Sequence, residues 1–150
     1  GRGKVSGEVL VQTCTPEHPA ITAVAAANAA EAEREFRKRE LAERRDALYP
    51  PFTRLVTLHA DGPDEAQVEA AATAIAERAR ERGAEHDIQV LGPAPQALAK
   101  LRGRHRWHVL LKGANGAALR EVAADALAQA DQPGHRAVRV MADVDPIEVL

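Results

Sequence analysis

The pattern of apolar and polar residues changes at Tyr49-Pro50-Pro51-Phe52. After this segment apolar residues alternate with polar ones in four stretches, the period-two pattern typical of strands: 53–60, 88–91, 105–112 and 136–142. Two further stretches, 64–82 and 115–131, place apolar residues on one helical face, with Asp64 as a candidate N-cap of the first. The order predicted is strand, helix, strand, strand, helix, strand.

This order is typical of an α+β, ferredoxin-like β-α-β-β-α-β domain. Such a domain has a four-stranded antiparallel sheet with both helices on one face, which leaves the other face open. The turn residues at 61–64 and the Gly/Pro residues after Leu91 predict loops between the strands.

The chain before this domain has a different pattern. The apolar run in Glu8–Gln12 predicts a short buried strand, and an Ala-rich stretch at 20–30 followed by the charge-dense stretch 31–48 predicts helix. The two prolines after Tyr49 should end that helix. We therefore predict three segments: residues 1–15, a helical linker at 16–52, and a domain at 53–150.

Composition limits the kinds of function that are possible. The chain has 45% hydrophobic and 28% charged residues, and no apolar run approaches the roughly 20 residues of a membrane span. The single cysteine, Cys14, excludes an internal disulfide framework, which fits a cytoplasmic protein, and no membrane partner is expected.

The sequence contains no evident catalytic or metal-binding motif. The six histidines are scattered, and no phosphate-binding glycine loop or Ser-His-Asp arrangement is evident. Asp143 and Asp145 could form a carboxylate pair, but their position before Pro146 favours a turn. We expect no catalytic residue, no metal site and no cofactor within these 150 residues.

One stretch concentrates positive charge although the whole chain has a net charge of −2. No acidic residue lies between Asp87 and Glu121. The basic residues of the stretch are Lys100, Arg102, Arg104, Arg106 and Lys112. Alternation places Arg104, Arg106 and Lys112 on one side of a strand and Trp107 on the other, where it would anchor the core. A loop before that strand would bring Lys100 and Arg102 to a second phosphate. The stretch either contacts the DNA backbone or is simply a solvated sheet face.

Four blocks of sequence resemble one family in the same order: Gly7–Thr13, Tyr49–Phe52, Val90–Gly113 and Asp143–Glu148. They are similar to the C-terminal part of the primosomal protein N′ (PriA) family of replication-restart helicases. The resemblance implies that residues 1–15 end the second helicase lobe and that 53–150 form a DNA- and partner-binding domain. It also implies that Arg2 matches a motif arginine that faces the γ-phosphate of a nucleotide.

The resemblance further implies a function in DNA replication restart. The domain would recognise stalled or branched forks and help to reload the replicative helicase, with forked or single-stranded DNA, the single-stranded-DNA-binding protein and helicase-loading primosome proteins as partners. The parent protein would be an ATP-dependent 3′-to-5′ DNA helicase with ATP, Mg²⁺ and zinc bound by upstream domains. Arg120, beside Leu119, is the candidate contact for the acidic tail of the single-stranded-DNA-binding protein, although other members have a basic residue one turn earlier, where this chain has Gly116.

Two alternatives stay open. The domain could be a structural or regulatory appendage with a merely solvated basic strand. It could also bind RNA without recognising forks, because contacts to phosphates do not distinguish the two sugars.

Overall fold

The computed structural model describes residues 9–130 and 137–147 and divides the chain into two compact units, residues 1–43 and 44–150. The first unit contains helix α1 (Pro19–Ala25) and most of helix α2 (Ala29–Asp46), which ends in the second unit. His18 caps α1, because its Nδ1 accepts a hydrogen bond from the amide of Ala20. Asn28 precedes α2, and its Oδ1 accepts from the amide of Glu31.

A strand was predicted at 8–12, and the structure describes residues 9–12 of this stretch, which do not form one. Residues 9–12 form no regular secondary structure, and Val9 and Leu10 are 84% and 93% exposed. Glu8 lies outside the described residues. A strand needs hydrogen-bonding partners on a neighbouring strand, and residues 9–12 pair with none of the four described strands.

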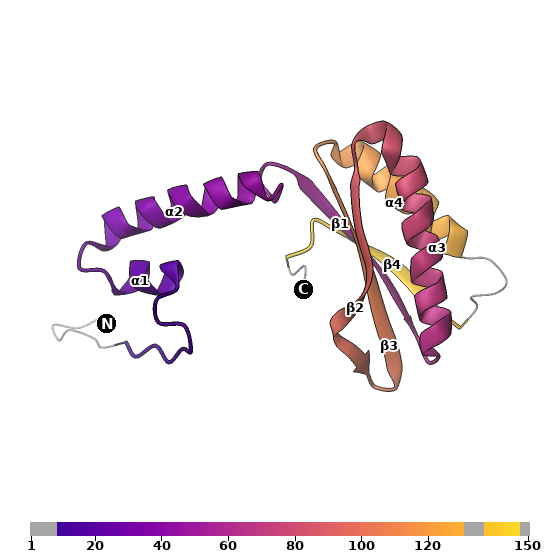
Figure 1. Ribbon diagram of the computed structural model, residues 1–150, viewed down its shortest axis with the longest axis horizontal. Coiled ribbons are helices and arrows are strands. Elements are labelled where there is room, and N and C mark those ends of the chain that lie inside the picture. The colour runs from indigo at the N-terminus through magenta and orange to yellow at the C-terminus, as the bar shows by residue number, and fades with distance from the viewer. Residues whose placement is uncertain (1–8, 131–136, 148–150) are drawn as a thin grey trace, which may run out of the picture. The chain divides into compact units, whose positions relative to one another are not determined.

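The second unit is built on a four-stranded antiparallel sheet in the order β2-β3-β1-β4. The strands are β1 (Arg54–Gly62), β2 (Gln89–Leu101), β3 (Arg104–Gly113) and β4 (Arg139–Val144). Helices α3 (Glu65–Gly83) and α4 (Gly116–Ala130) lie side by side on one face, and a short 3₁₀ helix, Ala84–His86, follows α3 (Figure 1). The predicted ferredoxin-like α+β fold is confirmed.

The helices begin where polar side chains can accept hydrogen bonds from free amides. Asp64 caps α3 as predicted, its Oδ1 accepting from the amide of Gln67 at 2.9 Å. Asn115 does the same for α4 and accepts from the amides of Ala117 and Ala118. These caps fix the point at which the chain leaves the sheet and crosses its face.

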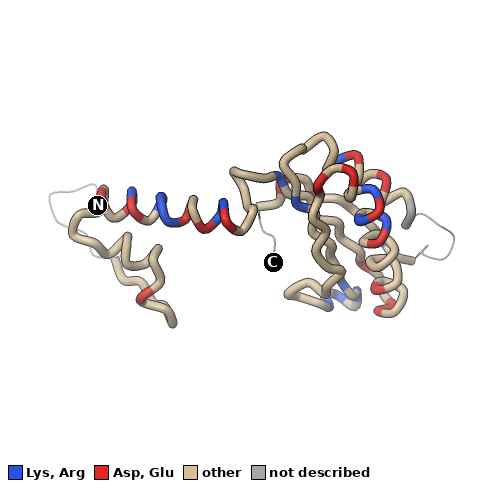
Figure 2. Tube along the Cα trace, turned by 45° about the horizontal axis from the view of Figure 1, so that its top comes forward, with Lys and Arg blue, Asp and Glu red and all other residues tan. Residues whose placement is uncertain are grey.

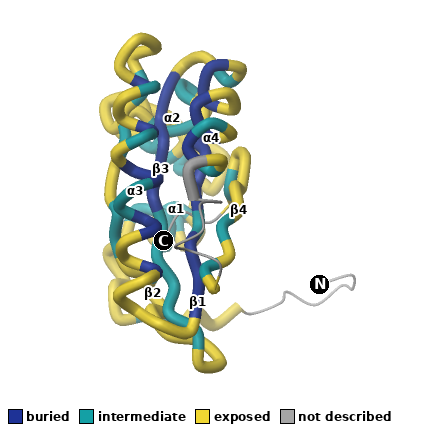
Figure 3. The backbone as a smooth tube through the Cα atoms, turned by 90° about the vertical axis from the view of Figure 1, so that its right-hand side faces the viewer, coloured by how far each residue is buried: buried dark blue, intermediate teal, exposed yellow. Residues whose placement is uncertain are grey.

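The core lies between the sheet and the two helices. Buried residues shown in Figure 3 run along the central strands and along the helix faces that cover them. The main cluster includes Val56, Leu58, Val109 and Leu111 from the sheet, with Ile75, Leu119 and Val122 from the helices. Trp107 lies on this face as predicted, but it is only partly buried and packs against a smaller cluster around Ala60 and Val68.

Several predicted boundaries are wrong, and two of them affect the candidate site. Asp61 and Gly62, predicted as a turn, belong to β1, because they pair with Arg106 and His105 of β3. The predicted loop after Leu91 is strand, so β2 continues to Leu101 and joins β3 through Arg102 and Gly103 alone. Those two residues have φ of 50° and 78°. Positive φ at both central residues is what a tight two-residue hairpin turn requires.

The remaining differences are smaller. Strand β4 begins at Arg139, three positions after the predicted start at Arg136, which lies outside the described residues. Helix α2 ends at Asp46, before the predicted Leu48, because Leu48 has a left-handed φ of 53°. The amide of Tyr49 then donates to the carbonyl of Arg44, which closes the helix end.

Lys112 holds the segment after α2 onto the sheet. Its Nζ donates a hydrogen bond of 2.9 Å to the carbonyl oxygen of Ala47. The same atom lies 3.9 Å from the centre of the Tyr49 ring, a cation–π contact. The side chain is therefore engaged in a structural contact at the end of β3.

Candidate nucleic-acid interface

The pairing of β1 with β3 sets which residues face away from the helices. His59 lies opposite His108 and Asp61 opposite Arg106, and residues in register point to the same face of a sheet. Because Leu58 and Val109, one position along, lie in the core, these polar residues lie on the open face. The predicted alternation of β3 is confirmed, with Arg106 and Lys112 on one face and Trp107 on the other.

The β2–β3 hairpin carries three of the predicted basic residues, with Lys100, in register with His105, on the face opposite to Arg106. Lys100 and Arg102 are exposed near the turn, and Arg106 follows on β3. None of the three forms an ion pair with any residue in 9–130 or 137–147. Figure 2 shows Lys and Arg gathered near the end of this hairpin. This end therefore keeps positive charge that the described part of the chain does not neutralise.

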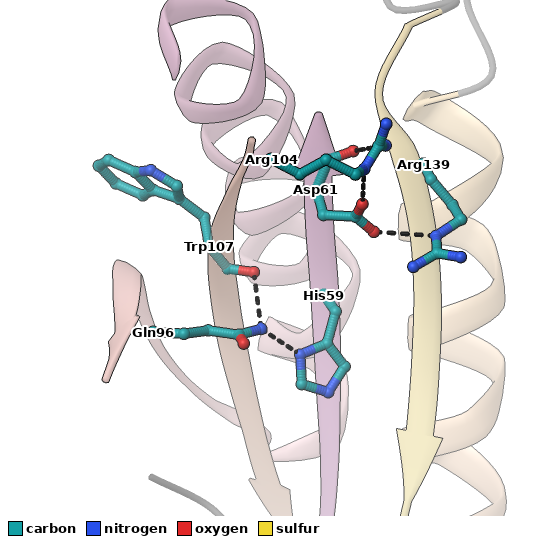
Figure 4. Close-up of polar contacts among 6 residues, drawn as sticks. All are labelled: His59, Asp61, Gln96, Arg104, Trp107 and Arg139. Atoms are coloured by element: carbon teal, nitrogen blue, oxygen red, sulfur yellow. Dashed lines mark hydrogen bonds and ion pairs between the residues drawn. The ribbon is translucent and has the colours of Figure 1, made fainter. Parts of the chain in front are cut away.

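Arg104 differs from its neighbours because it is held by Asp61. Its Nε donates to one oxygen of the Asp61 carboxylate, and its Nη2 donates to the Asp61 carbonyl at 2.8 Å (Figure 4). Arg139 of β4 donates to the other carboxylate oxygen at 2.9 Å. One carboxylate thus joins three strands.

Asp61 remains ionised in this arrangement. Burial alone would raise its pKa, but hydrogen bonds from Arg104 and Arg139 outweigh burial, so the pKa lies below its ordinary value of 3.8. The negative charge is only 11% exposed at the side chain, whereas Arg104 and Arg139 are 41% and 70% exposed. Arg104 therefore offers less net charge to a phosphate than its position in the sequence suggests.

Next to this group, His59 and Gln96 form a second polar contact. Gln96 Nε2 lies 2.7 Å from Nδ1 of His59 and 3.5 Å from the carbonyl oxygen of Trp107 (Figure 4). Since a carbonyl oxygen only accepts, the amide nitrogen faces both groups and donates to His59. Burial is the main cause of a lowered His59 pKa, with His108 and Arg106 adding to it and Asp143 opposing it. The neutral ring then carries its proton on Nε2.

Lys112 lies apart from the other predicted DNA contacts. It is eight positions from Arg104 along β3, roughly 27 Å at the rise of a strand. Its exposed fraction is 6%, and burial lowers its pKa. Its ammonium group already binds the Ala47 carbonyl and the Tyr49 ring, so the structure does not present it together with Lys100 and Arg102.

Arg120 is exposed on the first turns of α4. Its Nη1 lies 3.5 Å from the position that a Cβ on Gly116 would take, and the side chain of Arg54 is 3.7 Å from the same point. Arg54 in turn pairs with Asp145 at 2.7 Å. Arg120 therefore places its charge over Gly116, one turn before its own backbone position. Arg2 lies outside the described residues.

Sequence patterns did not identify four residues of the open face: His59, Asp61, Gln96 and Arg139. They come from β1, β2 and β4, and no local spacing links them. The strand register that places Asp61 between Arg106 and Arg139 is the information that would have located these residues. That register depends on β1 extending to Gly62.

The described residues lack the features of two other kinds of site. Among residues 9–130 and 137–147, no group of three or more His, Cys, Asp or Glu side chains could hold a metal ion. No helix in the same residues is long and apolar enough to span a membrane.

Comparison with known proteins identifies the family. The model of the primosomal protein N C-terminal domain matches residues 45–147. The chain belongs to this family. It is also 38% identical over 112 residues to the replication restart protein PriA of Synechocystis, 32% over 146 residues to that of Haemophilus influenzae, and 33% over 150 residues to that of Treponema pallidum.

These matches cover 75%, 97% and 100% of this chain but only 13%, 19% and 22% of the three relatives. The chain thus spans about a fifth or less of the relatives' length. The family match begins at residue 45, next to the start of the second compact unit at Arg44. The primosomal protein N C-terminal domain therefore comprises the sheet, its two helices and the segment that Lys112 holds.

The histidines of the open face should make stability fall in mild acid. Burial is the largest cause of the lowered pKa of both His59 and His108, so the unfolded chain, with the ordinary value of 6.5, takes up protons first as pH falls. Their contribution is present above about pH 6.5 and is lost as pH falls through the folded values. Urea unfolding should give a lower free energy at pH 5.5 than at pH 7.5.

The variant His59→Gln should reduce this difference, whereas His86→Gln, at an exposed position, should not. Asp61 titrates separately. Because its pKa is lowered in the folded chain, its contribution to the free energy of unfolding is lost only below about pH 4. An unfolding free energy that stays constant from pH 7.5 to 5.5 would contradict the assignment of partly buried, neutral histidines.

Proposed function

We propose that this chain is the DNA- and partner-binding part of a replication-restart protein that recognises stalled or branched forks and helps to reload the replicative helicase. Family membership supports a function in primosomal replication restart, because the relatives are named as replication restart proteins. Fork recognition and helicase reloading are the more specific parts of this proposal.

The observation that supports DNA binding is the free positive charge at the end of the β2–β3 hairpin. Lys100, Arg102 and Arg106 have no ion-pair partner in the described residues. A tight turn joins the two strands, which pair next to it at Lys100 with His105 and Leu101 with Arg104. Lys and Arg neutralise backbone phosphates whatever the base sequence, which suits a protein that must bind at many positions on a chromosome.

The alternatives have different signatures. A structural appendage would leave these cations solvated and bind no nucleic acid. An RNA-binding module would use the same cations, so competition between forked DNA and RNA of equal length separates it from the proposed function.

The other functions implied by the resemblance concern a longer protein. ATP with Mg²⁺, zinc and 3′-to-5′ unwinding are proposed for a full-length parent, with Arg2 facing the nucleotide. Sequencing or expressing the full-length gene and assaying DNA-dependent ATP hydrolysis tests this. A full-length protein without such activity would act as a scaffold. That result would still be compatible with DNA binding by the present domain.

Salt dependence measures the proposed backbone contacts. If Lys100, Arg102 and Arg106 each neutralise one phosphate, the plot of log affinity against log salt should have a slope of about −2.7 on duplex DNA and about −2 on single strands. Replacing Lys100 and Arg102 together by Ala should make the slope less negative by about two, measured by fluorescence anisotropy with forked DNA. The fold should be unchanged, since both side chains are exposed.

Two controls make the result specific. Arg34→Ala with Lys38→Ala removes the same charge from exposed positions of α2 and should leave the slope unchanged. Lys112→Met should also leave it unchanged, because that ammonium group binds Ala47 and Tyr49. Equal slopes for the hairpin variant and the unaltered chain would refute DNA binding by the hairpin.

We also propose Arg120 as a contact for the acidic tail of the single-stranded-DNA-binding protein. Support comes from its position: the guanidinium lies over Gly116, the place at which the resemblance implies a basic residue in other members. Arg54 lies close to the same point, but its charge is partly neutralised by Asp145, so Arg120 is the main cation for a terminal carboxylate. The absence of a side chain at Gly116 gives the guanidinium of Arg120 room to reach it.

A labelled tail peptide tests this contact. Arg120→Glu should weaken its binding at least tenfold, because an attractive charge becomes a repulsive one next to the carboxylate. Arg120→Lys keeps the charge and should lose much less. DNA affinity should change little in either variant, since Arg120 lies on a helix and not on the hairpin. Unchanged peptide affinity in Arg120→Glu would remove this residue from the site.

A further inference from the structure

The open face of the sheet has a hollow of about 290 Å³ beside the basic hairpin. Its lining comes from four strands and includes His59, Gln96, Arg106, Met141 and Asp143. Asp61 and Arg139, joined to each other, form part of the same wall. The hollow therefore lies within the arrangement that the Asp61 carboxylate holds together.

Three polar groups of this hollow have no protein partner in residues 9–130 and 137–147. Arg106 forms no ion pair, and neither does Asp143. Nε2 of His59 carries the ring proton, because Nδ1 accepts from Gln96, and no hydrogen bond from Nε2 is formed. Met141 lies opposite His59 in the β1–β4 pairing and is 48% exposed, which gives the hollow an apolar side.

The free cation and the free anion lie at different ends of the hollow. In the strand register, Arg106 lies opposite Asp61 and Asp143 lies opposite Thr57. Arg106 and Asp143 therefore lie beside positions four residues apart on β1, about 13 Å at the rise of a strand, and on opposite sides of that strand. A ligand that satisfies both must be negative at one end and a hydrogen-bond donor at the other, with a flat or apolar part between them. An isolated phosphate does not meet this requirement, because it would leave Asp143 without a donor and be repelled by its carboxylate.

A nucleotide within a DNA strand does meet it. We propose that the hollow binds one unpaired nucleobase, with the adjoining phosphate on Arg106 and an exocyclic amino group of the base donating to the Asp143 carboxylate. This rests on the proposed function, since the hairpin must hold the rest of the strand. The planar groups of His59 and Arg106 provide surfaces on which a base can stack, as imidazole and guanidinium groups do in single-strand recognition.

The carboxylate makes the site selective. Within a surface that binds a polyanion, Asp143 lowers affinity unless a donor compensates it. Cytosine presents an exocyclic amino group, whereas thymine presents a carbonyl oxygen at the corresponding position. The two bases are similar in size, so a comparison between them isolates the contact to Asp143.

Equal-length oligonucleotides of deoxycytidine and thymidine test the proposal. At pH 7.5 and fixed salt, the 150-residue chain should bind oligo-dC about fivefold or more tightly than oligo-dT, the effect of one base contact. Asp143→Ala should bring this ratio close to one while oligo-dT binding stays equal or becomes tighter, because a repulsive charge is lost. Asp143 is exposed and forms no ion pair with a described residue, so the variant should fold.

A second variant tests the stacking surface. His59→Ala should weaken binding of both oligonucleotides about fivefold or more without changing the salt slope, and circular dichroism should show an intact fold. The matched control Arg102→Ala should make the salt slope less negative by about one while leaving the ratio of the two affinities unchanged.

The outcomes distinguish failure of the base site from failure of the proposed DNA-binding function. If oligo-dC and oligo-dT bind equally and Asp143→Ala changes neither, the base site is refuted while DNA binding by the hairpin stands. If the chain binds neither oligonucleotide in a salt-dependent manner, the proposed function itself fails. A preference for oligo-dC that survives in Asp143→Ala would also refute the site, because it would arise from another part of the surface.

Discussion

The antiparallel pairing of β1 with β3 is the constraint on which the rest of the structure depends. It runs from Arg54 opposite Gly113 to Gly62 opposite His105. Because side chains alternate along a strand, a shift of β1 by one residue against β3 would move Leu58 out of the core and His59 and Asp61 into it. Burying those polar groups beneath two helices would be costly. The apolar core therefore fixes the register, and the register assembles the polar open face.

Asp61 connects this constraint to function. Its carboxylate neutralises part of the charge of Arg104 and Arg139 and holds β3, β1 and β4 together at one end of the sheet. Lys100, Arg102 and Arg106 are left without such a partner in the described residues. The protein thus separates structural cations from available ones. Lys112 is another cation with a structural contact, because its ammonium group binds the Ala47 carbonyl and the Tyr49 ring near the start of the family match.

Much of the fold could be predicted from the sequence, because periodicity reports burial. The element order and the two faces of β3 were correct for this reason, and the Asp64 cap was correct because an Asp side chain accepts hydrogen bonds from free helix amides. The length of β2 could not be predicted from local signals: Gly92, Pro93 and Pro95 are typical of a loop, yet Ala94 and Pro95 still pair with β3 after an irregularity in register. Partners distant in sequence decided that outcome.

The candidate site was predictable only in part, for a similar reason. The density of Lys and Arg located the hairpin, but the sequence could not show that Arg104 would meet Asp61 and Lys112 would meet Ala47. Charge at a surface depends on which cations are already paired. The apolar run at 9–12 illustrates the same limit, because a strand needs a neighbouring strand and none of the described strands pairs with these residues.

The most direct test of the account is to map which backbone amides respond to DNA. Amide chemical-shift changes of the 150-residue chain should be measured by NMR as a short single-stranded oligonucleotide is added. We predict that the changes concentrate at residues 100–106 on the hairpin and extend over the open face to His59 and Asp143, with little change in the exposed faces of α3 and α4. Changes confined to those helices, or to α2, would contradict the assignment of the DNA-binding surface to the hairpin and the open sheet face.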